Sequence, residues 1–234
     1  MKLEICANSL QSALNAQLAG ADRIELCSEL SVGGITPSLG LLKLIKEKID
    51  IPVHVLIRPR SGNFNYTNDE FEQMKIDIQL CKDLGFAGIV SGVLKEDQSI
   101  DMERTQELID ISKPLSFTFH RAFVCVPKPE EALDKLIQLK VDRILTSGQK
   151  EKAIDGLELL KRLKKQAKDQ IIILPGSGIR PENAEIFKEA GFKEIHTSAS
   201  VSAKIKSPFF DSTEQSVSDP KTISEIVSII RNEA

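Results

Sequence analysis

Short runs of aliphatic residues alternate along the chain with longer segments in which apolar positions recur every three or four residues. The first pattern is typical of buried strands and the second of amphipathic helices. The strands are predicted at Leu3–Cys6, Arg23–Cys27, Val53–Arg58, Gly88–Ser91, Leu115–His120, Arg143–Thr146, Ile171–Leu174 and Glu194–Thr197. The third helical segment shows the helical spacing well, because Phe71, Met74, Ile78 and Cys81 fall on one face.

Residues that commonly cap helices flank the predicted helical segments. Thr67 or Asn68 can cap the third helix, and Asp219 followed by Pro220 can begin the last one. A glycine precedes several of the strands, as in "AGADRIEL", "LGFAGIV" and "AGFKEIH". Together these features indicate a strand–helix unit that repeats along the whole chain.

Eight such units predict an α/β protein, a single-domain (β/α)8 TIM barrel over residues 1–234. A doubly wound open sheet is the alternative, but it predicts a G-x-G-x-x-G turn after the first strand, where the chain has "CANSLQ". The long irregular segment 198–218 lies between the last strand and the last helix. A segment of this kind is expected to be either a lid or mobile.

Net charge and the length of apolar runs exclude some classes of binding partner. The net charge is −3, and the one dense basic run, Lys161–Lys165, reads as the solvated face of a helix, so nucleic acid and anionic membranes are not expected as partners. No apolar run approaches the roughly 18 residues of a membrane span, and Glu4 interrupts any leader-like start. We therefore expect a cytoplasmic protein whose four cysteines are reduced thiols.

Strand alternation directs many polar side chains into the predicted barrel. The inward set is Glu4, Cys6, Arg23, Glu25, Cys27, His54, Arg58, Thr118, His120, Glu194 and His196. Because buried charges are costly unless they pair, we expect an ion-pair network of Glu4, Arg23, Glu25, Arg143 and Glu194. Polar residues at the strand ends lie where barrels carry out chemistry.

Two of these strand-end residues are thiols. Cys6 and Cys27 end neighbouring strands with the same parity, which predicts that their sulfur atoms lie close together. Two thiolates suit a soft metal ion such as Cu(I). The alternative is that both are small buried hydrophobic residues, as free cysteines usually are.

Two further groups of strand-end residues suggest an anion site. Gly176, Ser177 and Gly178 precede a helix that begins near Pro181, so their backbone could hold a phosphate, unless they form a plain turn. The arginines Arg58, Arg60 and Arg121 could clamp a carboxylate or phosphate, with His120 as acid or base opposite Glu25. A second layer of ion pairs is the alternative. No lysine occupies an inward strand end, which disfavours Schiff-base chemistry.

The same stretches resemble the CutC family. The similarity includes "EICANS", "GADRIELCSEL", "VHVLIRPRSGNF", "TFHRAF", "VDRILTSGQ", "PGSGI" and "IHTSA", in this order over residues 1–199. The resemblance implies a cytosolic barrel, often a homodimer, with a role in copper homeostasis and with Cys6 and Cys27 as the copper ligands. It also implies a shared set of strand-end residues, namely Glu25, Arg58, Arg60, His120, Arg121, Ser147, Gln149 and His196.

The chain departs from the family pattern at two positions. Val124 stands where an acid is common in the family, and Asn63 stands where aspartate is frequent. Chemistry that depends on either acid is therefore not expected here.

Two hypotheses follow. The first, ranked higher because of the resemblance, is a copper homeostasis protein that holds Cu(I) through Cys6 and Cys27. The second is a barrel enzyme acting on a small anionic or phosphorylated metabolite. Its catalytic residues would be His120, Glu25 and Arg58, and its ligand-binding residues would be Arg60, Arg121, Ser147, Gln149, Gly176, Ser177, Gly178 and His196.

Overall fold

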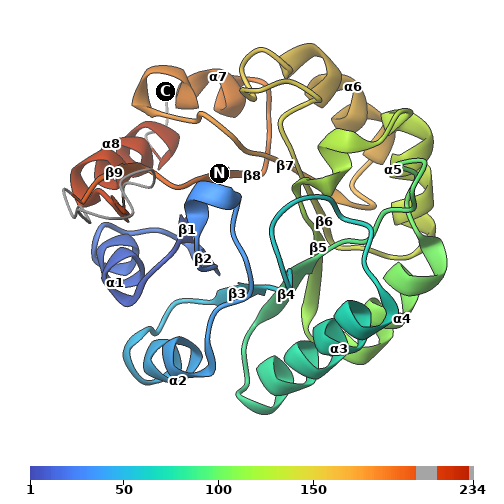
Figure 1. Ribbon diagram of the computed structural model, residues 1–234. Helices are drawn as coiled ribbons and strands as arrows, with labels where there is room; N and C mark the ends of the chain where they lie inside the picture. Colours follow the sequence, from blue (N-terminus) through green and yellow to red (C-terminus); the bar gives the residue numbers. More distant parts are fainter. Residues whose placement is uncertain (204–214, 232–234) are drawn as a thin grey trace.

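Eight parallel strands form the wall of a barrel, and helices surround it (Figure 1). The computed structural model describes residues 1–203 and 215–231. The strands are β1 (Lys2–Ala7), β2 (Arg23–Leu26), β3 (Val53–Leu56), β4 (Gly88–Ser91), β5 (Ser116–Phe119), β6 (Arg143–Thr146), β7 (Ile172–Pro175) and β8 (Glu194–Thr197). Their order is β7-β6-β5-β4-β3-β2-β1-β8, and a parallel bridge between Gly176 and His196 joins β7 to β8. The predicted (β/α)8 barrel is confirmed.

Each strand is followed by a helix, as the repeat predicts. The helices are α1 (Leu10–Leu18), α2 (Leu39–Lys48), α3 (Asn68–Asp83), α4 (Met102–Ser112), α5 (Pro129–Gln138), α6 (Leu157–Ala167), α7 (Pro181–Glu189) and α8 (Pro220–Arg231). Thr67 caps α3 through a capping box with Glu70, and Asp219 accepts the Thr222 backbone N–H at the start of α8. Within residues 1–203 and 215–231, no helix is long and apolar enough to cross a membrane.

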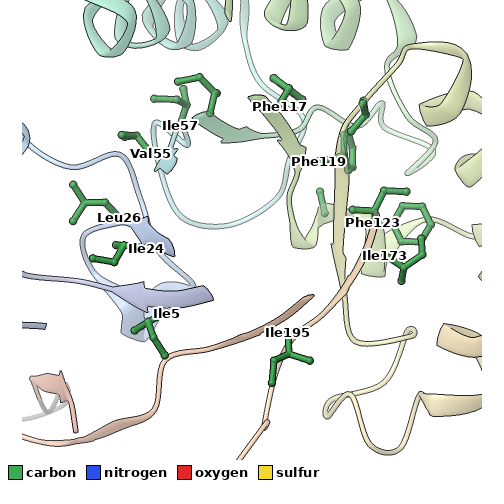
Figure 2. Packing of buried hydrophobic residues seen from close by; sticks show 14 of the residues in the cluster. Ile5, Ile24, Leu26, Val55, Ile57, Phe117, Phe119, Phe123, Ile173 and Ile195 are labelled. Carbon is green, nitrogen blue, oxygen red and sulfur yellow. The ribbon is translucent and has the colours of Figure 1, made fainter. Parts of the chain in front are cut away.

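Apolar strand residues fill the layer between the barrel wall and the helices. Figure 2 shows Ile5, Ile24, Val55, Phe117 and Ile195 on the outer side of their strands, in one hydrophobic cluster. All five are 2 % exposed or less. Because neighbouring side chains along a strand point to opposite faces, this packing leaves the intervening positions, which are largely polar, to line the barrel interior.

The segment between β8 and α8 contains structure that the sequence does not predict. Strands β9 (Ser200–Ser202) and β10 (Ser216–Ser218) pair in an antiparallel ribbon, so the expectation of an irregular segment is wrong at both of its ends. The Asn8 side chain anchors the ribbon by donating to the Ser216 carbonyl at 3.0 Å. The middle of the segment, residues 204–214, lies outside the described residues. The expectation of a lid or a mobile loop falls on these residues and stays a prediction.

Candidate functional site

A buried ion network occupies the lower part of the barrel interior. The Arg23 guanidinium on β2 contacts the carboxylates of Glu4 on β1 and Glu194 on β8. Arg143 on β6 donates through Nε to Glu194 at 2.9 Å. Burial alone would favour the neutral acid, but the charges of Arg23 and His196 outweigh it and hold the pKa of Glu4 far below its ordinary value. The predicted network is therefore confirmed for its four lower members.

Glu25 contacts no arginine of this network among the described residues and is linked to Glu4 through His196, so this part of the prediction is confirmed only in part. Its nearest charged partner is His196, whose Nδ1 lies 3.9 Å from Glu25 Oε2. No described residue donates a hydrogen bond to this oxygen, which is buried. Burial raises the pKa of Glu25. Glu25 lies apart from the arginines because it is one inward position above Arg23 on β2, where it is beside Cys6.

His54 shares the interior with the ion network because its neighbour on β4 has no side chain. A Cβ atom added to Gly88 would lie 2.5 Å from Cδ2 of the His54 ring. We expect Gly88→Ala to lower the free energy of unfolding by about 1–3 kcal/mol through overpacking, as measured by urea denaturation. Gly40→Ala on α2 is the matched control, since its Cβ would meet only the Ser38 hydroxyl, at 3.9 Å. Equal effects of the two substitutions would contradict this reading.

Above the ion network, two thiols meet at the ends of β1 and β2. The Sγ atoms of Cys6 and Cys27 are 3.6 Å apart, and Cys6 Sγ lies 3.7 Å from Glu25 Oε1. His196 is on the other side of β1, where its Nδ1 contacts Glu4 Oε1 at 2.8 Å. Ligand atoms of Cys6, Glu25 and His196 all lie within 4.8 Å of one another. These three residues form a group that can hold a metal ion.

The charges in this group are strongly coupled. The Cys27 thiol and burial together hold the pKa of Cys6 well above its ordinary value. Burial disfavours the charged ring of His196, but Glu25, Cys6 and Glu4 outweigh it and hold the pKa of His196 well above its usual range. At neutral pH the Cys6 thiol is therefore protonated, and His196 is a cation paired with Glu4.

A cavity of about 220 Å³ opens above these residues. It lies at the carboxyl ends of the strands, which is where (β/α)8 barrels place their active sites. The predicted site residues that line it are Cys6, Glu25, Arg58, His120, Arg121, Ser147, Gly176, Ser177, Gly178 and His196. The barrel thus brings together in one space residues from strands far apart in the sequence.

Three predicted residues are not part of the cavity lining. Cys27 is fully buried beneath it, next to Cys6. Arg60 turns away from the barrel and forms an ion pair with Glu70 of α3. The side-chain amide of Gln149 donates to the Val126 carbonyl.

Several lining residues have no counterpart among the predicted site residues, and Arg180 and Phe64 are the two with the clearest chemical consequence. Arg180 follows the loop after β7, and its Nη2 donates to the Ser200 carbonyl at 3.2 Å. Phe64 follows β3 and packs its ring 5.0 Å from the Arg58 guanidinium. The sequence signals were present, an arginine after "GSGI" and a phenylalanine after "RSGN", but both lie beyond the strand ends on which the prediction relied. Val124, one of the departures from the family pattern, also lines the cavity.

The glycine loop after β7 forms one wall of the cavity. Ser177 and Gly178 both have positive φ angles, of 85° and 70°. The backbone N–H of Gly176 donates to the Thr146 carbonyl at 3.1 Å, and the Ser177 hydroxyl donates to the Glu151 carbonyl at 2.7 Å. The Gly176 amide and the Ser177 hydroxyl thus already donate to protein carbonyl groups. The loop therefore has fewer free hydrogen-bond donors for a phosphate than the sequence suggests.

Comparison with known proteins agrees with this arrangement. Residues 1–201 match the CutC family. The chain is 50% identical over 198 residues to a copper homeostasis protein cutC homolog of Homo sapiens, covering 84% of this chain and 72% of that protein. It is 49% identical over 199 residues to a family protein CutC of Salmonella schwarzengrund, covering 85% and 80%. A solved CutC structure from Streptococcus agalactiae superimposes with a TM-score of 0.80 at 34% identity, covering 85% of this chain and 98% of that one.

The matched region contains every residue of the thiol pair, the ion network and the cavity lining described above. With a family match over most of the chain and relatives near 50% identity, the assignment follows directly. The chain belongs to the CutC family.

Proposed function

We propose that this protein binds Cu(I) through Cys6 and Cys27 and takes part in copper homeostasis in the cytoplasm. The observation that carries the proposal is the 3.6 Å separation of the two sulfur atoms, in a group where His196 and Glu25 also offer ligand atoms. The names of the relatives in the CutC family support the same function. A homodimer, and one domain over residues 1–234, stay predictions.

The donor chemistry of the group fits this metal. Thiolates are soft ligands that select Cu(I), whereas the carboxylate of Glu25 is a hard ligand suited to other ions. Binding replaces the thiol protons, and Glu25 Oε1, 3.7 Å from Cys6 Sγ, is positioned to accept one of them. Glu4 holds the ring of His196 by a hydrogen bond at 2.8 Å, which is the usual arrangement behind a histidine ligand. Cys6 is 5 % exposed and lines the cavity, so an ion reaches the pair from that side.

Anaerobic titration of the reduced protein with Cu(I), in competition with a chromophoric chelator, tests the proposal. We expect one equivalent to bind in the wild type. Affinity should fall by at least about 100-fold in Cys6→Ser and Cys27→Ser, because each variant loses one of two soft ligands. Cys125→Ser is the matched control, since that thiol is exposed and lies outside the cavity lining. Retained binding when Cys6→Ser and Cys27→Ser are combined in one variant, or an equal loss in Cys125→Ser, would contradict the copper proposal.

A second candidate function is an enzyme that acts on a small anionic metabolite. The position of the cavity at the carboxyl ends of the strands favours it, together with the raised pKa of Glu25. In this candidate Glu25 is the better proton-transfer group. Burial and the charge of Arg58 lower the pKa of His120 to about 3, so the ring is neutral at physiological pH and suited to donate a hydrogen bond. How the cavity would recognise an anion is a separate question.

A further inference from the structure

We propose that Arg58, Arg121 and His120 form an oxoanion site on one wall of the cavity, and that it takes the phosphate or carboxylate group of a small metabolite. The site gives the ligand class of the enzyme candidate and rests on that candidate only for the chemistry that follows binding. It does not depend on copper, whose proposed ligands Cys6 and Cys27 lie at the ends of β1 and β2.

Arg58 is a buried cation without a carboxylate partner. The residue is 4 % exposed, and its guanidinium donates to the backbone carbonyls of Val32, Gly34 and Gly62 at 2.8–3.0 Å, with the Tyr66 hydroxyl as a further neutral neighbour. Its Nε is buried and has no hydrogen-bond partner among the described residues. A full charge is costly to bury without a counter-ion, and carbonyl dipoles and the face of Phe64 offset that cost only in part. An anion in the cavity would complete this environment.

A second guanidinium converges on the same point. The space where a Cβ atom of Gly33 would stand lies 3.3 Å from Arg58 Nη1 and 3.6 Å from Arg121 Nη1. Among the described residues Arg121 forms no salt bridge, and it lines the cavity beside Arg58. Two cations held this close repel each other unless an anion binds both. Paired guanidinium groups are the usual protein clamp for a phosphate or carboxylate.

His120 adds a neutral donor to the two cations. Its Nδ1 accepts the backbone N–H of Ala122 at 3.3 Å, so the neutral ring carries its proton on Nε2. This Nε2 is buried and finds no acceptor among the described residues, although the ring lines the cavity. The Phe64 ring, 4.8 Å away, packs against it and fixes its position. The site therefore combines two guanidinium groups that have no carboxylate partner among the described residues with a neutral His120 ring whose Nε2 has no acceptor among them.

The rest of the cavity sets the size and charge of the ligand. Arg180 is on the opposite wall, and Glu25 is the one acidic residue among the lining residues described. The lining is thus cationic. A volume of about 220 Å³ is smaller than the roughly 300–1,000 Å³ of typical drug-sized sites, so the ligand is a small metabolite. When the oxoanion is bound at Arg58 and Arg121, the remainder of the ligand faces Cys6, Glu25 and His196.

Isothermal titration with inorganic phosphate, and separately with malonate, tests this site at low salt. Arg121→Gln is the informative variant, because the side chain is exposed and makes no hydrogen bond that the fold requires among the described residues. We expect the favoured anion to bind the wild type with millimolar affinity or better and to bind Arg121→Gln at least about tenfold more weakly. The anion that binds more tightly shows whether the group is a phosphate or a carboxylate.

Arg60→Gln is the matched control. It removes the same charge two residues from Arg58, but Arg60 is paired with Glu70 outside the cavity lining, so binding should change by less than about twofold. No binding of either anion by the wild type at about 10 mM, or an equal loss in both variants, would overturn the proposal. Binding without conversion of any metabolite would support the site and count against the enzyme candidate.

Discussion

Replacing Arg23 by methionine is expected to lower the free energy of unfolding by about 3–5 kcal/mol. The substitution keeps most of the side-chain volume but leaves the carboxylates of Glu4 and Glu194 in the barrel interior without their shared cation. Arg143 still reaches Glu194 at 2.9 Å and His196 still contacts Glu4 at 2.8 Å, so the penalty comes from two buried carboxylates that each lose one of two partners. Equilibrium unfolding in urea at neutral pH, followed by circular dichroism, measures the change.

Two further variants separate the buried charge from the loss of an ion pair as such. Arg162→Met on α6 breaks an exposed pair with Glu130, whose atoms are 3.5 Å apart, and should cost less than about 1 kcal/mol. Adding Glu4→Gln to Arg23→Met removes one of the two carboxylates that lost Arg23 and should recover part of the lost stability. If Arg23→Met costs no more than Arg162→Met, the network does not have the energetic role described here.

The fold and the inward side chains could be predicted because barrel strands alternate strictly. Ile5 and Ile24 pack outward while Glu4 and Glu25 point inward. Because side chains alternate along a strand, the position of a residue in its strand predicts whether it faces the helices or the barrel interior. The ion network follows from the same alternation, because Arg23 cannot be buried without acids nearby. The proximity of Cys6 and Cys27 also follows, since the register pairs Cys6 with Glu25 and brings the two strand ends together.

Alternation gives no information beyond the strand ends, and there the sequence was a poorer guide. Arg58 and Arg60 look equivalent in "IRPRSG", yet Arg58 enters the barrel and Arg60 pairs with Glu70. The direction of Arg60 depends on where the capping box places Glu70, which spacing along the chain does not reveal. Arg180 lines the cavity although it lies five residues after the end of β7, and its direction is fixed by a contact with the Ser200 carbonyl that the sequence does not reveal. The protonation of His120 likewise depends on burial and on Arg58, which are properties of the folded structure.

Stability is expected to fall steeply as the pH drops from about 6.5 to 4. Burial lowers the pKa of His54 to about 4 and the pKa of His120 to about 3, both below the ordinary value of 6.5. The unfolded chain therefore binds protons at these positions before the folded protein does, so the free energy of unfolding rises with pH across this range. At pH 4 each histidine lowers the free energy of unfolding by about 3 kcal/mol relative to its value above pH 6.5. This loss is a large part of the stability of an ordinary domain.

Glu25 opposes this trend in part, because burial raises its pKa and the folded protein therefore takes up this proton before the unfolded chain does as the pH falls. The trend still holds, because two buried histidines act against one carboxyl group. His196 has a raised pKa, so its contribution is fully present below pH 6.5 and is lost only as the pH rises above that value. Glu4 has a lowered pKa and adds to the loss of stability once the pH falls below about 4.5. His120→Asn should remove about half of the slope between pH 6.5 and 4.5, because the asparagine does not titrate while His54 still does. Urea unfolding of the wild type at a series of pH values measures the slope, and a flat profile from pH 7 to 4.5 would mean that these two rings are not buried as neutral groups.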